Sequence, residues 1–255
     1  MVRIYQCQLT LHDNVFFATR EMGTLYETDK YLHNWALSFA LFENSYLRKP
    51  YRTQGEYAQK PRYLDAPDRP DIPTLLHLNS VGIYVFPAQP ITWSYQINTF
   101  KAAQVNYHAK TDKFGEGDAK RNYPANIGRA KELTVGSTFR IYIISTEMIN
   151  FPQWIRLGKW SSKIHLEAKL IPETAIASKL GQYTCSHPLN PIDLPNSSAL
   201  LLYDCLVMSP SSLVSQSRLT GKYWQISKTD NSPNWLHDIC LPKDVFYGAT
   251  NIRDS

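Results

Sequence analysis

The sequence predicts an α+β fold built mainly from antiparallel β-sheet, with one early helix and long insertions. Apolar and polar residues alternate in several short stretches, as is typical of half-buried strands. One stretch near the N-terminus instead repeats its apolar residues every three or four positions, as one face of a helix does. Two charged segments, 44–73 and 101–131, interrupt this order and indicate loop or hairpin insertions.

The composition supports a packed core and argues against several classes of protein. The chain has 255 residues, 43% hydrophobic and 13% aromatic. It has no run of about 18 apolar residues that could span a membrane. Its first residues read as a strand and not as a signal peptide, so we expect a cytoplasmic protein. The four cysteines (Cys7, Cys185, Cys205 and Cys240) form no CxxC pair, which argues against zinc and disulfides.

The first strand and the helix follow from these two periodicities. Residues 2–11 alternate, with Cys7, Leu9 and Leu11 on one face, and predict a half-buried strand. A helix is expected to begin near residue 28 or 29, because Thr28 and Asp29 are acceptable N-caps. Its buried face would comprise Leu32, Trp35, Ala36, Phe39 and Ala40.

The later elements are expected to be mostly strands. Four segments have the pattern or composition of strands: 75–86, 91–100, 133–144 and 164–171. A short helix is expected over residues 152–157, ahead of a basic loop. The apolar run 199–208 predicts a central strand, and residues 222–227 are a candidate partner for it.

Positive charge is concentrated in segments that are expected to be loops. The net charge is +5. Segment 48–69 holds six cations and three acids, segment 101–131 holds seven and three, and segment 156–163 holds three cations and no acid. A polyanionic partner would explain this distribution. Solvated charged loops are the simpler alternative.

The segment 154–166 is the strongest candidate binding element. It combines three cations, one glycine, two serines and two tryptophans. Cations, exposed backbone N–H groups and flat rings suit a phosphate backbone that carries unstacked bases. The candidate nucleic-acid-binding residues here are Arg156, Gly158, Lys159, Trp160, Ser161 and Lys163. A basic turn between two strands, without a ligand, is the alternative.

The insertion 101–131 is a second candidate binding element. Its basic residues are interleaved with Tyr107, Phe114 and Tyr123, a pattern that can clamp a single strand by charge and stacking. The candidate binding residues are Lys101, Lys110, Lys113, Lys120, Arg121 and Arg129. A solvated hairpin is the alternative. Arg20, between the first strand and the helix, could also reach a ligand, or pair with an acid such as Glu21 or Glu27.

No catalytic or metal-binding constellation is recognised in the sequence. Walker-type, dinucleotide, HExxH and GxSxG motifs are absent. The seven histidines stand singly. His12 and His33 flank the first strand–helix unit, and such a pair would suit an acid–base ribonuclease if the two met in space. We assign no catalytic residue, no metal and no cofactor.

Four stretches taken together resemble a known family. They are 3–5 (RIY), 11–23 (LHDNVFFATREMG), 31–34 (YLHN) and 155–163 (IRLGKWSSK). They are similar to the Csc-type, Cas-five-like subunit of the type I-D CRISPR surveillance complex, Cascade. The last stretch is similar to the glycine-rich loop of the wider RAMP superfamily. It departs from the fuller loop in having only Gly158.

The resemblance implies a single RAMP-type domain over residues 1–255, with a modified ferredoxin-like (RRM-like) core and an antiparallel sheet. It implies a non-catalytic subunit that caps the complex and holds the 5′ handle of the CRISPR RNA for antiviral DNA interference. The implied partners are this RNA, the backbone subunit and the large subunit. The sequence leaves open whether target DNA near the protospacer-adjacent motif is contacted. A thumb that kinks the RNA is also implied. We place it at 101–131 by charge and position, with 44–73 as the competing segment.

Two alternatives stay open at this point. The first is a metal-independent endoribonuclease that processes precursor CRISPR RNA, as some Cas-five-like relatives in another subtype do. It would draw on His12 or His33, with Arg20 or Lys159 as the cationic stabiliser. The second is a structural adaptor whose basic loops contact an acidic protein partner.

Overall fold

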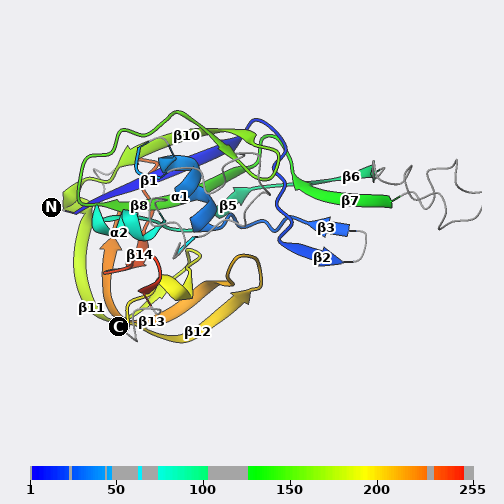
Figure 1. Ribbon diagram of the computed structural model, residues 1–255. Coiled ribbons are helices and arrows are strands. Elements are labelled where there is room, and N and C mark those ends of the chain that lie inside the picture. The colour runs from blue at the N-terminus through cyan, green and yellow to red at the C-terminus, as the bar shows by residue number, and fades with distance from the viewer. Residues whose placement is uncertain are drawn as a thin grey trace, which may run out of the picture.

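The computed structural model describes residues 2–22, 25–43, 45–47, 63–64, 74–102, 126–228 and 233–249. This part of the chain is mostly antiparallel sheet with few helices, as the sequence predicts (Figure 1). None of the helices found in it is both long and apolar enough to cross a membrane.

The largest sheet, here called the central sheet, forms the body of the molecule (Figure 1). Its strand order is β4-β8-β1-β10-β9, and β5 also pairs with β8. The bounds are β1 Arg3–Leu11, β4 Ile83–Val85, β5 Gln89–Thr92, β8 Thr138–Ser145, β9 Trp154–Leu157 and β10 Ser162–Leu170. The predicted alternation of the first strand is confirmed, because Cys7, Leu9 and Leu11 are all buried in the core. This strand lies at the centre and pairs antiparallel with β8 and β10.

Helix α1 (Asn34–Phe42) covers one face of the central sheet and packs against β4 and β9. It begins later than the predicted Thr28 or Asp29. His33 is its N-cap, and the His33 side chain accepts a hydrogen bond from the Trp35 backbone N–H. Thr28 is engaged elsewhere, because its hydroxyl bonds both backbone groups of Phe17. The helical periodicity was a correct signal, but the choice of cap depended on tertiary contacts.

A second sheet packs beside the central sheet, with the order β11-β13-β12 and with β14 also paired to β13. Its strands are β11 Ile176–Cys185, β12 Ala199–Leu206, β13 Leu213–Ile226 and β14 Ile239–Pro242. Two short 3-10 turns, Glu173–Ala175 and Pro191–Asp193, lie in the loops of this region.

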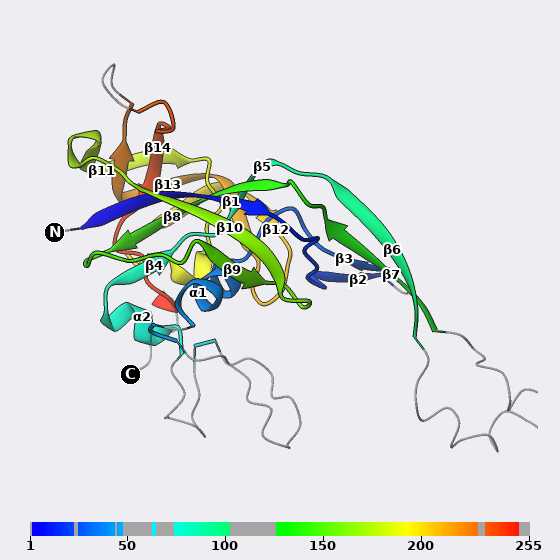
Figure 2. The same cartoon turned by 90° about the horizontal axis from the view of Figure 1, so that it is seen from above.

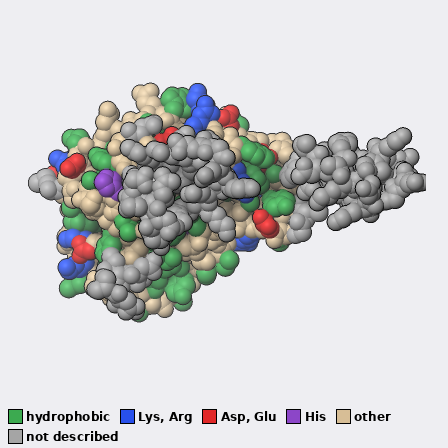
Figure 3. Space-filling model, viewed as in Figure 1, with side chains coloured by type: hydrophobic (Ala, Val, Ile, Leu, Met, Phe, Trp, Pro, Cys, Tyr) green, Lys and Arg blue, Asp and Glu red, His purple; other side chains and the backbone are tan. Residues whose placement is uncertain are grey.

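The apolar run 199–208 was wrongly predicted to be a central strand. It does form β12, but β12 lies at the edge of its sheet. Leu201 and Leu202 are 52% and 64% exposed. Hydrophobic side chains are visible along the lower edge of the body in Figure 3, where Figure 1 places β12. The predicted pairing is also wrong, since residues 222–226 pair with β11 and β14, and β12 pairs with residues 213–220.

The third sheet has the order β2-β3-β7-β6. Its strands are β2 Arg20–Met22, β3 Leu25–Glu27, β6 Tyr95–Ala102 and β7 Asn126–Leu133. Strands β6 and β7 form an antiparallel ribbon that extends away from the body (Figures 1 and 2). The central part of the insertion 101–131 lies outside the described residues, and so does most of segment 44–73.

Two further predictions need correction. Residues 75–86 are not one strand, because they form helix α2 (Leu76–Ser80) followed by β4. Residues 152–157 are not a helix. Ile155 and Leu157 are buried and Trp154 and Arg156 are exposed, which is the alternation of strand β9. The period of two in the burial of these residues is that of a strand.

A buried polar cluster joins α1, β4 and the C-terminal segment. Asp193 is fully buried. Its Oδ2 accepts hydrogen bonds from Asn34, Trp35 and Tyr84, and its Oδ1 accepts one from the Gly248 backbone N–H. Burial is the main influence on the carboxyl and raises its pKa to about 6. Four donors around one carboxylate offset most of the cost of burying the charge.

We expect stability to fall on mild acidification because of two buried histidines. Burial lowers the pKa of His33 and of His187 to about 3, from the ordinary value of 6.5. Between pH 6.5 and about 3, these two histidines bind protons in the unfolded chain but not in the folded chain. Each histidine therefore lowers stability by up to about 1.4 kcal/mol per pH unit as the pH falls from 6.5 toward 3. Asp193 has a raised pKa and acts in the opposite direction between about pH 6 and 3.8.

From pH 7 to pH 5 these three groups together should remove roughly 2 to 3 kcal/mol of unfolding free energy. Urea denaturation at pH 7 and at pH 5 measures this change in unfolding free energy. In the variant His33→Asn the capping function is kept but one titrating group is lost. That variant should lose about 2 kcal/mol less over the same pH range. Equal stability of the wild-type protein at pH 7 and pH 5 would contradict this assignment.

Candidate nucleic-acid interface

The basic segment predicted as a loop is a hairpin with a tight turn. Strands β9 and β10 are joined by the four residues 158–161, and Leu157 pairs with Ser162. The turn closes with a hydrogen bond from the Ser161 N–H to the Gly158 carbonyl, with an N···O distance of 3.1 Å. Gly158 and Ser161 both have positive φ, 83° and 54°. Strand geometry therefore fixes where each cation of this segment lies.

Gly158 permits a close approach to its backbone, but the group that approaches is part of the same chain and not a ligand. A Cβ at this position would lie 2.9 Å from the Phe16 carbonyl oxygen. That same oxygen accepts a hydrogen bond from the Lys159 backbone N–H at 2.9 Å. The Lys163 backbone N–H is likewise engaged, by the Asp13 carboxylate at 2.7 Å. The sequence predicts exposed backbone N–H groups in this segment. At Lys159, Ser161 and Lys163 these groups instead donate hydrogen bonds within the protein.

The cations of the hairpin lie on two different sides of it. Ile155 and Leu157 are buried on the side where α1 packs against β9. Arg156 alternates with them and lies on the opposite side of the strand. Lys163 pairs with Arg156 across the two strands and shares that side. Lys159 in the turn instead lines a cavity that also contacts α1, so the expected single basic site is divided.

The turn carries one ring of a stacked aromatic pair, and its Lys159 lines a cavity. Trp160 stacks on Phe16 with a centroid distance of 4.7 Å, and Trp160 remains 54% exposed. The cavity has a volume of about 180 Å³ and lies between the turn, the start of α1 and the segment 208–210. Phe17, Tyr31 and Lys159 are among its lining residues. A cation next to exposed aromatic surface suits a nucleotide.

Arg20 is half exposed and anchored by two contacts. Its Nη2 lies 3.2 Å from the Asp29 carboxylate, and its Nε donates to the Val207 carbonyl at 3.2 Å. The partner acid is therefore Asp29, whereas the sequence suggested Glu21 or Glu27. Glu27 pairs with Lys131 at 3.3 Å. These contacts fix the direction of the guanidinium, and its exposed part can still meet a ligand.

The ribbon carries two of the predicted binding residues within the described part. Arg129 is exposed on β7. Lys101 lies on β6 opposite Ile127, and its side chain is outside the described atoms. The remaining residues predicted there lie outside the described residues: Lys110, Lys113, Lys120 and Arg121.

Residues 13–17 connect the turn to the base of the ribbon. On one side, the Ser162 hydroxyl donates to the Asn14 carbonyl at 2.6 Å. On the other side, Val15 and Leu133 exchange two backbone hydrogen bonds of 2.9 and 3.0 Å. The Asn14 side chain also accepts from the Val135 N–H at 3.1 Å. This segment therefore holds the hairpin turn and the β6–β7 ribbon in fixed positions relative to each other.

The predicted histidine pair is not a shared site. His33 is buried at the start of α1, and its Nε2 contacts the Ser211 carbonyl and hydroxyl oxygens. His12 lies on the other face of the central sheet, where its ring contacts Trp154 and His165. No local sequence signal marks this second grouping, because pairing of β1, β10 and β9 creates it. Among the described residues, no cluster of three or more His, Cys, Asp or Glu could hold a metal ion.

Gly158→Ala should destabilise the hairpin more than the matched variant Gly136→Ala. The two glycines have nearly the same φ, 83° and 82°, so both variants carry a similar backbone cost of about 1 kcal/mol. A Cβ at position 136 meets nothing within 4 Å, whereas one at 158 meets the Phe16 carbonyl oxygen. We expect Gly158→Ala to cost at least about 1 kcal/mol more in urea denaturation. Equal losses would show that the approach to Phe16 is not tight in solution.

Comparison with known proteins gives one match that spans nearly the whole chain. A family model described as type I-D CRISPR-associated protein Cas5/Csc1 matches residues 2–250. No curated protein matches the chain.

Two solved structures are similar at low identity. One is a chain in the cryo-EM structure of the Type III-B Cmr-beta bound to cognate target RNA and AMPPnP. It is 9% identical, with a TM-score of 0.41 over 84% of this chain and 86% of that one. The other is a CRISPR protein from Archaeoglobus fulgidus, 10% identical, with a TM-score of 0.36 over 95% and 100% of the two chains. At these TM-scores neither similarity carries an argument. On the family match, the protein belongs to the type I-D CRISPR-associated Cas5/Csc1 family.

Proposed function

We propose that this protein is a non-catalytic CRISPR RNA-binding subunit of the type I-D Cascade complex. In this proposal it caps the complex and holds the 5′ handle of the CRISPR RNA for antiviral DNA interference. One structural observation carries the proposal: residues 13–17 bond to the hairpin turn on one side and to the base of the β6–β7 ribbon on the other. Family membership supplies the CRISPR context.

The RNA would run past the turn on the side of Lys159. The ammonium group of Lys159 suits a phosphate, and the face of Trp160 that Phe16 does not cover can stack with a base. Arg20 and Arg129 lie on the same four-stranded sheet, on β2 and β7, and add positive charge near the ribbon. Each phosphate contact releases counterions and so contributes salt-dependent affinity.

The fold-level proposal is that the central sheet with α1 is a modified ferredoxin-like (RRM-like) RAMP core in a single cytoplasmic domain. The β6–β7 ribbon, with the residues that it carries, would be the thumb that kinks the RNA. The partners of the protein would be the CRISPR RNA, the backbone subunit and the large subunit. The projection of the ribbon away from the body supports this assignment (Figure 2).

The surroundings of His33 argue against a catalytic role for this histidine. Burial holds the pKa of His33 at about 3, so its imidazole stays neutral and away from solvent. Its Nδ1 accepts from the Trp35 N–H, and its Nε2 faces Ser211. A general acid or base must reach the proton that it transfers. His33 lines the same cavity as Lys159, but both of its ring nitrogens are engaged within the protein, which argues against its use as a general acid or base. His12, the other candidate of the ribonuclease alternative, is exposed.

Lys159→Ala should weaken binding to CRISPR repeat RNA, with Lys222→Ala as the matched control. Lys222 is an exposed lysine on the second sheet, 3.5 Å from Asp244. Fluorescence anisotropy with labelled repeat RNA in EDTA, at several salt concentrations, measures both variants. Loss of one phosphate contact should reduce the slope of log affinity against log salt by about 0.7. The control should keep the wild-type slope and affinity.

The same samples on a denaturing gel separate the alternatives. The proposal requires intact RNA, and preference for the repeat over a scrambled RNA of equal composition. Discrete cutting in EDTA would instead support the ribonuclease. Equal binding of the two RNAs, or of wild type and Lys159→Ala, would contradict handle binding at this turn. Assembly of the complex without RNA would favour the adaptor.

A further inference from the structure

The face of the central sheet opposite α1 is exposed over the ends of β1, β10 and β9. Leu11, Ile164 and Ile155 point toward the core, so the residues that alternate with them point outward. We call this surface the open face, and its residues are Gln8, Thr10, His12, Trp154, Arg156, Lys163, His165 and Glu167.

Strand register places the aromatic and basic side chains of the open face in two adjacent rows. In one row, Thr10 is opposite His165 and His165 is opposite Trp154. In the next row, Lys163 is opposite Arg156, and the His12 N–H bonds the Lys163 carbonyl. Side chains in such cross-strand positions lie about 5 Å apart. The rows end at the hairpin turn that carries Lys159 and Trp160.

Trp154 is the centre of this arrangement. The His12 and His165 rings lie 4.9 and 4.7 Å from its ring centroid, and the Lys163 ammonium lies 4.0 Å from it. Trp154 nevertheless remains 42% exposed. A tryptophan with a cation and two imidazoles around it offers a ring for stacking, a charge for phosphate and donors for hydroxyl groups.

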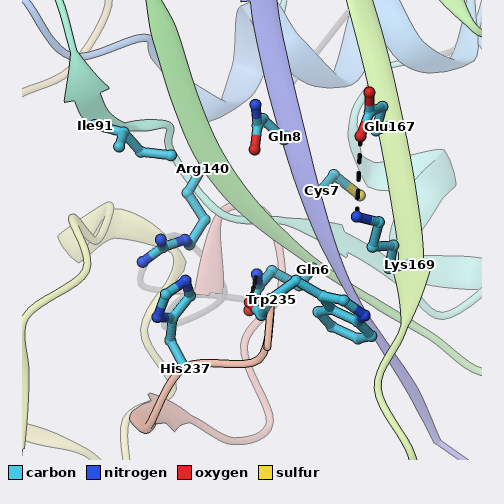
Figure 4. Close-up of a pocket in the computed structure, with 9 residues that line it drawn as sticks. All are labelled: Gln6, Cys7, Gln8, Ile91, Arg140, Glu167, Lys169, Trp235 and His237. Carbon is cyan, nitrogen blue, oxygen red and sulfur yellow. Dashed lines mark hydrogen bonds and ion pairs between the residues drawn. The ribbon is translucent and has the colours of Figure 1, made fainter. Parts of the chain in front are cut away.

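The same face continues past Gln8 toward the loop that holds Trp235. A cavity of about 110 Å³ lies there, and its lining includes Arg140, Lys169 and His237. Arg140 and His237 point toward each other (Figure 4). Glu167 lies 3.9 Å from the Lys169 ammonium. Cations thus occur along the whole length of this face. Two acids lie among them, and both are paired: Glu167 with Lys169, and Asp13 with Arg156 at 3.7 Å.

We propose that the open face binds a further stretch of the same single-stranded RNA, with one base stacked on Trp154 and phosphates near Lys163 and Arg156. The inference rests on the proposed function, because the turn between β9 and β10 is only four residues long. A strand bound at Lys159 therefore reaches the open face by crossing this turn. RNA is the favoured occupant, since the imidazoles of His12 and His165 can bond a 2′-hydroxyl.

The test compares full-length Trp154→Ala with Trp154→Phe and Trp224→Ala. Trp224 also has a lysine over its ring, Lys243 at 4.3 Å, but lies on the second sheet. Affinity for labelled repeat RNA is measured in EDTA, and thermal melting checks that each variant is folded. Trp154→Ala should bind about tenfold more weakly, the value of one base–aromatic stack. Trp154→Phe should restore most of the affinity, and Trp224→Ala should leave it unchanged.

A double variant distinguishes failure of this inference from failure of the proposed function. Lys159→Ala and Trp154→Ala combined should weaken binding by the product of their separate effects, as for two independent contacts. If only Lys159→Ala weakens binding, the open face carries no RNA and the handle site stands. If only Trp154→Ala does, the handle site at the turn falls and the open face stands.

Competition identifies the nucleic acid. A DNA oligomer of the same sequence should displace the labelled RNA less well than unlabelled RNA does. Equal or better competition by DNA would overturn the assignment to RNA. A wild-type protein that binds neither would overturn both proposals.

Discussion

The backbone hydrogen bonds of residues 12–16 are the constraint on which the candidate interface depends. His12 bonds to Lys163, Val15 bonds twice to Leu133, and Phe16 accepts from Lys159. A hairpin turn and a projecting ribbon from distant parts of the chain are thereby placed next to one short segment. Leaving any of these groups buried without a partner would cost about 1 to 3 kcal/mol, so the arrangement resists local opening. Gly158 belongs to the same constraint, because a side chain there would displace Phe16.

The period of two in β9 and β10 then determines what each basic residue can do. It directs Arg156 and Lys163 to the open face, whereas the turn presents Lys159 toward the cavity beside α1. Read as one flexible loop, the segment 156–163 predicts a single cluster of three cations. Read as two strands and a turn, it predicts two surfaces that share one edge. An RNA strand that crosses this edge would contact both, which joins the two proposals.

The sequence was a good guide where the signal was local. Alternation located β1 and β10, and helical spacing located α1. Of the predicted buried face of α1, Trp35 and Phe39 are buried, whereas Ala36 and Ala40 are only half-buried. Prediction from the sequence failed where pairing between distant strands decides the structure. The grouping of His12 with Trp154 and His165 depends on register between strands about 150 residues apart. The edge position of β12 depends on strand order, which an apolar run does not encode. His33, proposed as a catalytic partner, instead caps a helix whose start was placed too early.

The central claim is that RNA passes the hairpin turn between β9 and β10. Crosslinking the wild-type protein to repeat RNA substituted with 4-thiouridine, followed by mass spectrometry of the joined peptides, tests it without any mutation. The account predicts crosslinks to the peptides that contain Trp160 and Trp154, and fewer when unlabelled repeat RNA competes. Crosslinks confined to the second sheet, for example around Trp224, would contradict it.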